Sequence, residues 1–179
     1  MTLLLDLREI RGSEERVDRS YPAATFGPDP HDEYSVADRV SLALRVRKDG
    51  DKCHVSGRVC TTLNLSCSRC LEQFGIPCDL AVDLLYLPHS ANRGDGETEI
   101  AEDDLSTAFY RDGRIDLMQM VREQFQLALP MKPLCRGDCR GLCPVCGSNL
   151  NERRCRCDTQ WHDPRLAALE ALLPGRQRR

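Results

Sequence analysis

Eight of the 11 cysteines in this chain fall into four closely spaced pairs, and these residues offer the clearest chemistry in the sequence. In chain order the pairs are Cys67 and Cys70, Cys135 and Cys139, Cys143 and Cys146, and Cys155 and Cys157. Two thiolates separated by a tight turn can bind one metal ion, and a structural zinc ion takes four such ligands in a tetrahedron. The four pairs therefore predict one or two structural zinc ions and can form two closed four-thiolate sites, which stabilise a fold and leave no coordination position open for catalysis.

The lengths of chain between the pairs indicate how they are grouped. The third pair belongs to a Cys143-Pro-Val-Cys146-Gly147 knuckle, and residues 147–154 then form a loop long enough to return the fourth pair to the same ion. Only residues 140–142 separate the second pair from the third, so two knuckles on one ion would be cramped there. We therefore expect the second pair to share an ion with the first, which would tie a hairpin tip to the end of a helix.

A redox role is the alternative for the first pair. In a reducing cytosol, closely spaced cysteines bind metal or carry out thiol chemistry more often than they form a disulfide framework. A redox dithiol needs a lowered thiol pKa, and Arg69 alone gives thin support for one. The alternative function is a thiol redox protein or redox switch that uses Cys67 and Cys70. The remaining three cysteines have no close partner and are expected to be small buried core residues: Cys53, Cys60 and Cys78.

Basic side chains surround the last three cysteine pairs. They are Lys132, Arg136, Arg140, Arg153, Arg154 and Arg156, and they stand against the acidic residues Asp138, Glu152 and Asp158. Arginines held on a rigid metal knuckle can grip phosphates with little loss of side-chain entropy, so we predict that the six basic residues bind RNA. Solubilising charge on a segment with few other surface residues explains the same pattern equally well.

Composition limits the remaining functions. The net charge is −3 and aromatic residues make up 5% of the chain, so neither a global basic excess nor a stacking platform for single-stranded RNA is indicated. No apolar run approaches the roughly 18 residues of a membrane span, and the charged N-terminus does not resemble a signal peptide. We expect a cytoplasmic protein without a membrane partner. The four histidines are scattered, and no catalytic constellation accompanies them, so we expect neither an enzyme nor a small-molecule substrate.

Alternating apolar residues predict a sheet in the middle of the chain. Residues 38–48, 53–66 and 78–86 each show the period-two pattern of a half-buried strand, and a return of residues 105–110 to the sheet is expected. An Asp-Gly turn joins the first two strands. Gly57 lies inside the second strand and predicts a bulge or bend. The first cysteine pair then lies at the tip of a long hairpin.

One helix is predicted after the sheet. Asp116 has the position of an N-cap, and the residues after it repeat at three-four spacing until Pro130 ends the helix. The expected fold class is α+β: an antiparallel β-sheet or partly open barrel packed by one long helix, followed by a C-terminal cysteine-rich zinc-knuckle segment. A short amphipathic helix is expected over residues 163–173.

These elements define three expected regions. Residues 1–37 form an N-terminal arm packed on the body, and it is read as mostly irregular from residue 11 because of its prolines and glycines. Residues 38–133 form the β-rich core with its helix, and residues 134–179 contain the knuckle segment, the final helix and a basic tail. The acidic cluster between the third strand and the helix is expected to be a solvated loop: Glu99, Glu102, Asp103 and Asp104.

The order of motifs resembles that of a known family. The motifs are Cys67-Ser-Arg-Cys70-Leu71, Ile115-Asp116-Leu117, Leu127-Ala128-Leu129-Pro130, Cys139-Arg140-Gly141-Leu142-Cys143-Pro144, Asn149-Leu150-Asn151, the Cys155-x-Cys157 pair and Asp163-Pro164-Arg165-Leu166. Together they resemble the YceD family of bacterial large-subunit ribosomal RNA accumulation proteins over roughly residues 35–173. The resemblance implies a non-enzymatic role in 23S ribosomal RNA accumulation or processing and in large-subunit assembly. It also implies ribosomal RNA or subunit assembly intermediates as partners, reached directly or through another protein.

Overall fold

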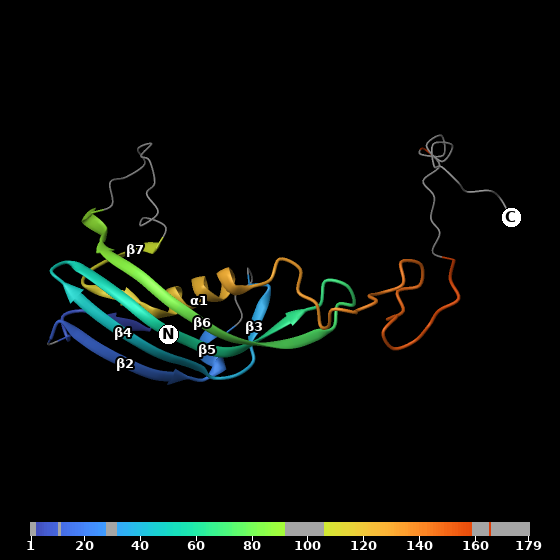
Figure 1. The fold of residues 1–179 in the computed structure, drawn as a ribbon, viewed down its shortest axis with the longest axis horizontal. Helices are drawn as coiled ribbons and strands as arrows, with labels where there is room; N and C mark the ends of the chain where they lie inside the picture. The colour runs from blue at the N-terminus through green and yellow to red at the C-terminus, as the bar shows by residue number, and fades with distance from the viewer. Residues whose placement is uncertain (1–2, 11, 28–31, 92–105, 159–164, 166–179) are drawn as a thin grey trace.

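The computed structural model describes residues 3–10, 12–27, 32–91, 106–158 and 165, and these ranges form a mixed α+β fold that is mostly sheet with one α-helix (Figure 1). The strands are β1 (Leu4–Asp6), β2 (Glu14–Tyr21), β3 (Tyr34–Val36), β4 (Val40–Asp49), β5 (Lys52–Ser66), β6 (Gln73–Pro88), β7 (Thr107–Tyr110) and β8 (Arg114–Asp116). The helix is α1 (Leu117–Ala128), and two short 3-10 turns are η1 (Ala23–Phe26) and η2 (His89–Ala91).

The three long strands predicted from alternation are confirmed as β4, β5 and β6, which pair antiparallel through successive hairpins. Their alternation matches burial: every second residue of β4 from Val40 to Val46 is buried, and the residues between them are exposed. The buried side of β5 likewise runs from Cys53 to Leu65. Period-two burial of this kind places one face of the sheet on the core and the other in solvent.

The expected bulge at Gly57 is absent. The register of β5 is continuous through Gly57 with both neighbouring strands, β4 and β6, and neither pairing contains an inserted residue. Glycine is needed there because the strands approach too closely for a side chain. A Cβ atom at Gly57 would lie 2.2 Å from the carbonyl oxygen of Ala43, and the backbone φ of +148° is one that residues with a side chain rarely adopt.

The N-terminal arm is more regular than predicted. Residues Glu14–Tyr21 form β2, which pairs antiparallel with β4 over its full length and extends the main sheet. The prediction of irregular chain was wrong for these residues. Only Val17 of β2 is buried, so the sequence of this strand shows no alternating pattern. An edge strand with a single buried side chain carries almost no alternation, and its pairing partner determines its structure.

The sheet is open and not wholly antiparallel. Its strand order is β2-β4-β5-β6-β7, with β3 paired to the far half of β5, so the described strands do not close into the barrel offered as one possibility. The return of residues 105–110 is confirmed for Thr107–Tyr110, but β7 runs parallel to β6. A separate two-stranded ladder joins β1 to β8, immediately before the helix.

The helix begins where the sequence predicts. The side chain of Asp116 accepts hydrogen bonds from the backbone amides of Met118 and Gln119 at 2.9 and 3.1 Å, which satisfies two free donors at the N-terminus. At 12 residues, α1 has an ordinary length and is not the long helix expected. Its buried face joins the core of the sheet, where the ring of Phe125 meets those of Phe26 and Tyr34 edge to face.

Several predictions lie outside the described residues: the acidic cluster around residue 100, the final helix over residues 163–173 and the basic tail. Among the described ranges, no helix is long and apolar enough to cross a membrane. Figure 1 shows that the chain after α1 runs toward the tip of the β5–β6 hairpin, and that the cysteine-rich segment extends beyond the end of the sheet.

The close approach at Gly57 generates a stability prediction. Gly57→Ala should lower the free energy of unfolding by about 3 kcal/mol, because the strained backbone and the contact with Ala43 must both be relieved. Urea denaturation measures the change. Gly137→Ala is the matched control, since a Cβ atom there meets nothing within 4 Å, and its effect should stay within about 0.5 kcal/mol. Equal stabilities for the two variants would contradict the steric argument.

Candidate metal centre

The eight paired cysteines come together in two groups of four. The buried tetrad contains Cys67, Cys70, Cys135 and Cys139, and the outer tetrad contains Cys143, Cys146, Cys155 and Cys157. Within each tetrad the four sulfur atoms all lie within 4.8 Å of one another. This is the grouping that the lengths of chain between the pairs predict. Each tetrad could hold one metal ion.

The sulfur separations fit a tetrahedral four-thiolate site. With metal–sulfur bonds of about 2.3 Å, the edge of such a tetrahedron is about 3.8 Å. In the buried tetrad the Sγ atoms of Cys67 and Cys139 are 3.7 Å apart, and those of Cys70 and Cys135 are also 3.7 Å apart. A disulfide bond would bring two sulfurs to about 2.05 Å, and all 11 cysteines are free. Sulfur is also the ligand that zinc uses in closed structural sites.

The buried tetrad joins the hairpin tip to the chain that follows the helix. After β5, the amide of Leu71 donates to the carbonyl of Cys67 at 2.9 Å, which closes a tight knuckle turn with Leu71 at a φ of +62°. The amide of Ser68 donates to the carbonyl of Pro133 at 2.8 Å. These bonds place the segment that carries Cys135 and Cys139 against the tip of the hairpin.

A second set of contacts continues from the tip into the cysteine-rich segment. The guanidinium of Arg69 donates to the carbonyl of Cys139 at 2.8 Å, and the carbonyl of Arg69 accepts from the amide of Leu142 at 3.1 Å. Gly141, with a φ of +74°, permits this approach, because a Cβ atom there would lie 3.0 Å from the carbonyl oxygen of Arg69. Arg69, considered at first as a possible activator of a redox thiol, therefore holds the backbone between the tetrads.

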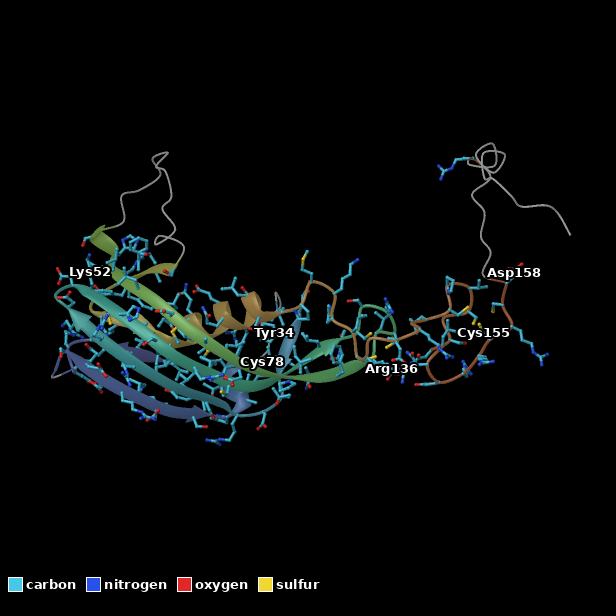
Figure 2. All side chains as sticks on the ribbon, in the orientation of Figure 1. Tyr34, Lys52, Cys78, Arg136, Cys155 and Asp158 are labelled. Atoms are coloured by element: carbon cyan, nitrogen blue, oxygen red, sulfur yellow. The ribbon has the colours of Figure 1, made fainter. Side chains whose placement is uncertain are left out.

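The outer tetrad is built on a second knuckle. The amide of Gly147 donates to the carbonyl of Cys143 at 2.9 Å, and the amide of Cys143 donates to the carbonyl of Ser148 at the same distance. Gly147 has a φ of +69°, the left-handed conformation that glycine adopts without strain. Cys143 is buried, Cys146 is exposed, and the two sulfurs of the fourth pair are half-buried. In Figure 2, Cys155 and Asp158 lie at the opposite end of the molecule from Lys52.

Residues 140–158 have no hydrophobic core of their own. Across this stretch, all of which the structure describes, Gly141 and Cys143 are the only buried residues. A segment that buries so little apolar surface gains little from the hydrophobic effect. Metal coordination is the physical alternative, because the free energy of metal binding then becomes free energy of folding.

The thiol pKa values within each tetrad are driven apart. In the buried tetrad, the backbone amide of Cys135 and other amide donors lower the pKa of Cys67 to about 6. Burial, together with contacts to the neighbouring thiols, raises the pKa of Cys135 to about 12. In the outer tetrad, the side chain and backbone of Ser148 lower the pKa of Cys146 to about 6, and the neighbouring Cys146 raises that of Cys157 to about 12. Four adjacent thiols cannot all ionise unless a cation offsets their charge.

Cysteine spacing alone did not single out two asparagines beside the tetrads, of which Asn151 contacts a tetrad sulfur and Asn149 contacts the hairpin tip. The amide of Asn151 donates to the Sγ atom of Cys139 at 3.3 Å, and Asn149 donates to the carboxylate of Glu72 at 3.0 Å. Both asparagines belong to a motif that supports the family resemblance. Polar side chains in a loop after a knuckle were the signal that could have identified them. The residues that they contact could be known only from the fold.

The predicted RNA-binding residues are all exposed: Lys132, Arg136, Arg140, Arg153, Arg154 and Arg156. Arg136 forms a 3.4 Å ion pair with Asp138, and Arg153 donates to the hydroxyl of Ser148 at 3.2 Å. Arg136 lies between the sheet and Cys155 in Figure 2. These positions leave the side chains accessible, and RNA binding stays a prediction.

The unpaired cysteines differ from one another. Cys53 and Cys78 are buried, as predicted. The prediction was wrong for Cys60, which is half-buried on the solvent side of the sheet and lies 3.3 Å from the carboxylate of Asp79. The reason is the pleat: Cys60 is out of phase with the buried residues of β5.

Comparison with known proteins yields one family. A family model described as large ribosomal RNA subunit accumulation protein YceD matches residues 55–173. An uncharacterized protein of Mycobacterium tuberculosis (strain ATCC 25618 / H37Rv) is 36% identical over 135 residues, which cover 75% of this chain and 62% of that protein. An uncharacterized protein of Mycobacterium leprae is 31% identical over 112 residues, which cover 62% of this chain and 49% of that protein.

A plant relative carries a functional name. The chloroplastic large ribosomal RNA subunit accumulation protein YCED homolog 1 of Arabidopsis thaliana is 24% identical over 168 residues, which cover 82% of this chain and 52% of that protein. The chain thus spans between 49% and 62% of the length of these three relatives. No solved structure gives a significant match.

The geometry of the tetrads predicts the metal content of the protein. Native mass spectrometry of the reduced chain should show two metal ions. Cys143→Ser should lose one ion and unfold the outer segment, because a structural site that loses a ligand no longer supplies folding energy. Cys78→Ser is the control, since Cys78 is buried but belongs to neither tetrad, and it should retain both ions. Unchanged metal content in Cys143→Ser would contradict the assignment.

The thiol pKa values predict how metal binding depends on pH. Cys135 and Cys157, with pKa values of about 12, are protonated at neutral pH and must each release a proton when a metal binds. Metal affinity should therefore rise at least about tenfold per pH unit at each site above pH 6. Below about pH 6, Cys67 and Cys146 also become protonated, so affinity should fall more steeply. Metal titrations at pH values from about 5 to about 8 test this prediction. A metal affinity that does not change over this range would contradict it.

Proposed function

Because the chain belongs to the YceD family, we propose that it supports the accumulation of 23S ribosomal RNA, and so the assembly of the large ribosomal subunit, as a binding factor that is not an enzyme. The observation that carries the proposal is the match of the family model to residues 55–173, a range that contains all eight tetrad cysteines. The names of the plant relatives describe large ribosomal RNA subunit accumulation. Since the chain spans only part of the length of its relatives, the extension of this role to it is part of the proposal.

In this proposal, zinc occupies both tetrads and has a structural role. Four thiolates complete the coordination of zinc and leave no position for a substrate or an activated water molecule. The metal would then do no chemistry. It would hold the cysteine-rich segment in one conformation and keep it attached to the hairpin tip.

We further propose that the cysteine-rich segment contacts the phosphate backbone of ribosomal RNA, in the cytoplasm where subunits assemble. Support comes from the exposure of all six basic side chains on a segment whose backbone is fixed by two knuckles. Of these six, Arg136 pairs with Asp138 at 3.4 Å. Two arginines on the solvent face of the sheet have closer carboxylate partners: Arg16 pairs with Asp18 and Arg58 with Asp79, both at 2.6 Å. Recognition of backbone and shape needs no aromatic stacking platform, which suits the low aromatic content.

One observation favours the redox alternative. The pKa of Cys67 is lowered to about 6, which would make it a thiolate at neutral pH. The same side chain has an exposed fraction of 0%, and its sulfur lies 3.7 Å from that of Cys139. A thiolate that attacks a substrate disulfide must be accessible, so a structural role explains the burial of Cys67 better.

The proposed function can be tested by complementation of a bacterial strain that lacks its own family member. Loss of the protein should lower 23S ribosomal RNA relative to 16S and reduce free and assembled large subunits on sucrose gradients. The wild-type chain should restore both, and a variant with three outer arginines neutralised should not: Arg153→Gln, Arg154→Gln and Arg156→Gln. Binding of that variant to 23S RNA fragments should weaken by about tenfold or more at moderate salt, because three phosphate contacts are lost.

The matched control removes the same number of charges from the sheet: Arg16→Gln, Arg45→Gln and Arg58→Gln. Each of these arginines already pairs with a carboxylate, so complementation should be retained. Restored function by the outer variant, with RNA binding unchanged, would instead favour contact through a protein on the assembling subunit. Normal ribosome profiles without the protein, together with insulin-disulfide reduction by the metal-loaded chain, would refute the proposal in favour of the redox alternative.

A further inference from the structure

Asn151 belongs to the loop of one tetrad but contacts a sulfur of the other. It lies between Cys146 and Cys155, which are both members of the outer tetrad. Its side chain is directed toward the buried tetrad, where the Nδ2 atom donates to the Sγ atom of Cys139 at 3.3 Å. The Oδ1 atom accepts from the amide of Arg140 at 2.8 Å, so both ends of the side-chain amide are bound to the segment that carries Cys139.

Asn149 holds Asn151 in this orientation. The Oδ1 atom of Asn149 accepts from the backbone amide of Asn151 at 3.0 Å and from its side-chain amide at 2.9 Å. The Nδ2 atom of Asn149 donates to Glu72 at 3.0 Å, two residues after Cys70 in the first knuckle. A continuous set of hydrogen bonds therefore runs from the hairpin tip through the outer loop to Cys139.

Backbone contacts connect the same two regions. The amide of Leu150 donates to the carbonyl of Gly141 at 2.9 Å, and Leu142 and Asn149 form an isolated antiparallel bridge. The loop is otherwise anchored by its ends, at the knuckle of Cys143 and at the fourth cysteine pair. A metal ion in the outer tetrad would join these two ends, and so fix the position from which Asn151 reaches Cys139.

We propose that the two metal sites are thermodynamically coupled through Asn151, so that metal in the outer tetrad strengthens metal binding in the buried tetrad. An N–H donor to a ligating sulfur orients the ligand and stabilises its negative charge, and loss of such a partner costs about 10- to 100-fold in metal affinity. Because coupling between two binding events is reciprocal, metal in the buried tetrad strengthens binding in the outer tetrad by the same factor. Asn151 is a positioning residue in this mechanism and is not itself a ligand.

Exposure sets the order in which the sites exchange metal. Three of the four cysteines of the buried tetrad are buried. In the outer tetrad, Cys146 is exposed, and Cys155 and Cys157 are half-buried. The outer ion is therefore the one that a chelator reaches first. Its removal frees the loop, withdraws the Asn151 donor and weakens the ion that remains.

The test is a titration of the reduced, metal-free full chain with Co²⁺, whose visible absorption reports tetrahedral thiolate coordination, followed by competition with a chelator. Asn151→Ala should still bind two ions, but the more tightly held ion should be weaker by about tenfold. Asn151→Asp, which keeps the acceptor for Arg140 and loses the N–H donor, should show a loss at least as large. Val145→Ala, an exposed change in the adjacent knuckle that alters no charge, is the control and should match the wild type.

A double-mutant cycle then separates coupling from local damage. The Cys155→Ser, Cys157→Ser variant should bind one ion, about tenfold more weakly than the tighter ion of the wild type. Adding Asn151→Ala to this variant should have little further effect, because the loop no longer presents the amide. Unchanged affinity in the Cys155→Ser, Cys157→Ser variant, or a full additional loss from Asn151→Ala in that background, would overturn the proposal. The readout is metal affinity, so its outcome is independent of any role in ribosome assembly.

Discussion

The described part of the cysteine-rich segment, residues 140–158, has no hydrophobic core of its own, and its conformation depends on another source of stabilising free energy. A fully buried aliphatic side chain contributes about 1.5–3 kcal/mol, yet residues 140–158 bury only Gly141 and Cys143. A structural zinc site contributes apparent free energies of about 10–16 kcal/mol in small zinc-binding peptides near neutral pH. Metal binding of this magnitude would allow a segment with many arginines and few apolar residues to hold a fixed conformation. The knuckle turns place the sulfurs, and metal would supply the free energy that a core supplies elsewhere.

The buried tetrad meets a different requirement. It lies at the tip of the long β5–β6 hairpin, and Phe74, Leu134 and Leu142 pack against its cysteines. Its ligands Cys70 and Cys135 are 65 residues apart, so one ion would close a loop that contains β6, β7, β8 and the helix. By analogy with a disulfide, restricting a loop of this length stabilises the folded state by about 4 kcal/mol. The buried tetrad thus joins the hairpin tip to the chain that follows the helix, whereas the outer tetrad organises a local segment.

Features set by local periodicity could be read from the sequence, and features set by a distant partner could not. Alternation identified β4, β5 and β6, and the lengths of chain between cysteines identified the two tetrads. Glu14–Tyr21 was missed because an edge strand with one buried residue has no pattern of its own. Gly57 was misread because a glycine required by close strand approach has the same sequence signature as one required by a bulge. The contact of Asn151 with Cys139 depends on tertiary structure, so chain spacing alone did not reveal it.

The charge of the metal centres changes how the basic segment should be understood. Four thiolates and one divalent ion sum to −2, so a filled outer tetrad adds two negative charges to a region with six basic and three acidic side chains between residues 132 and 158. The local balance would then fall from +3 to +1 with the outer tetrad alone, and further once the buried tetrad, which takes Cys135 and Cys139 from this region, is also filled. In a metal-loaded protein, part of the arginine charge would offset the thiolates, and only the remainder would be available to phosphates. The two explanations of the basic residues, solvation and RNA contact, are therefore compatible. Some arginines would balance the negative charge of the metal–thiolate centres, and RNA affinity would depend on the arginines whose charge is not balanced in this way.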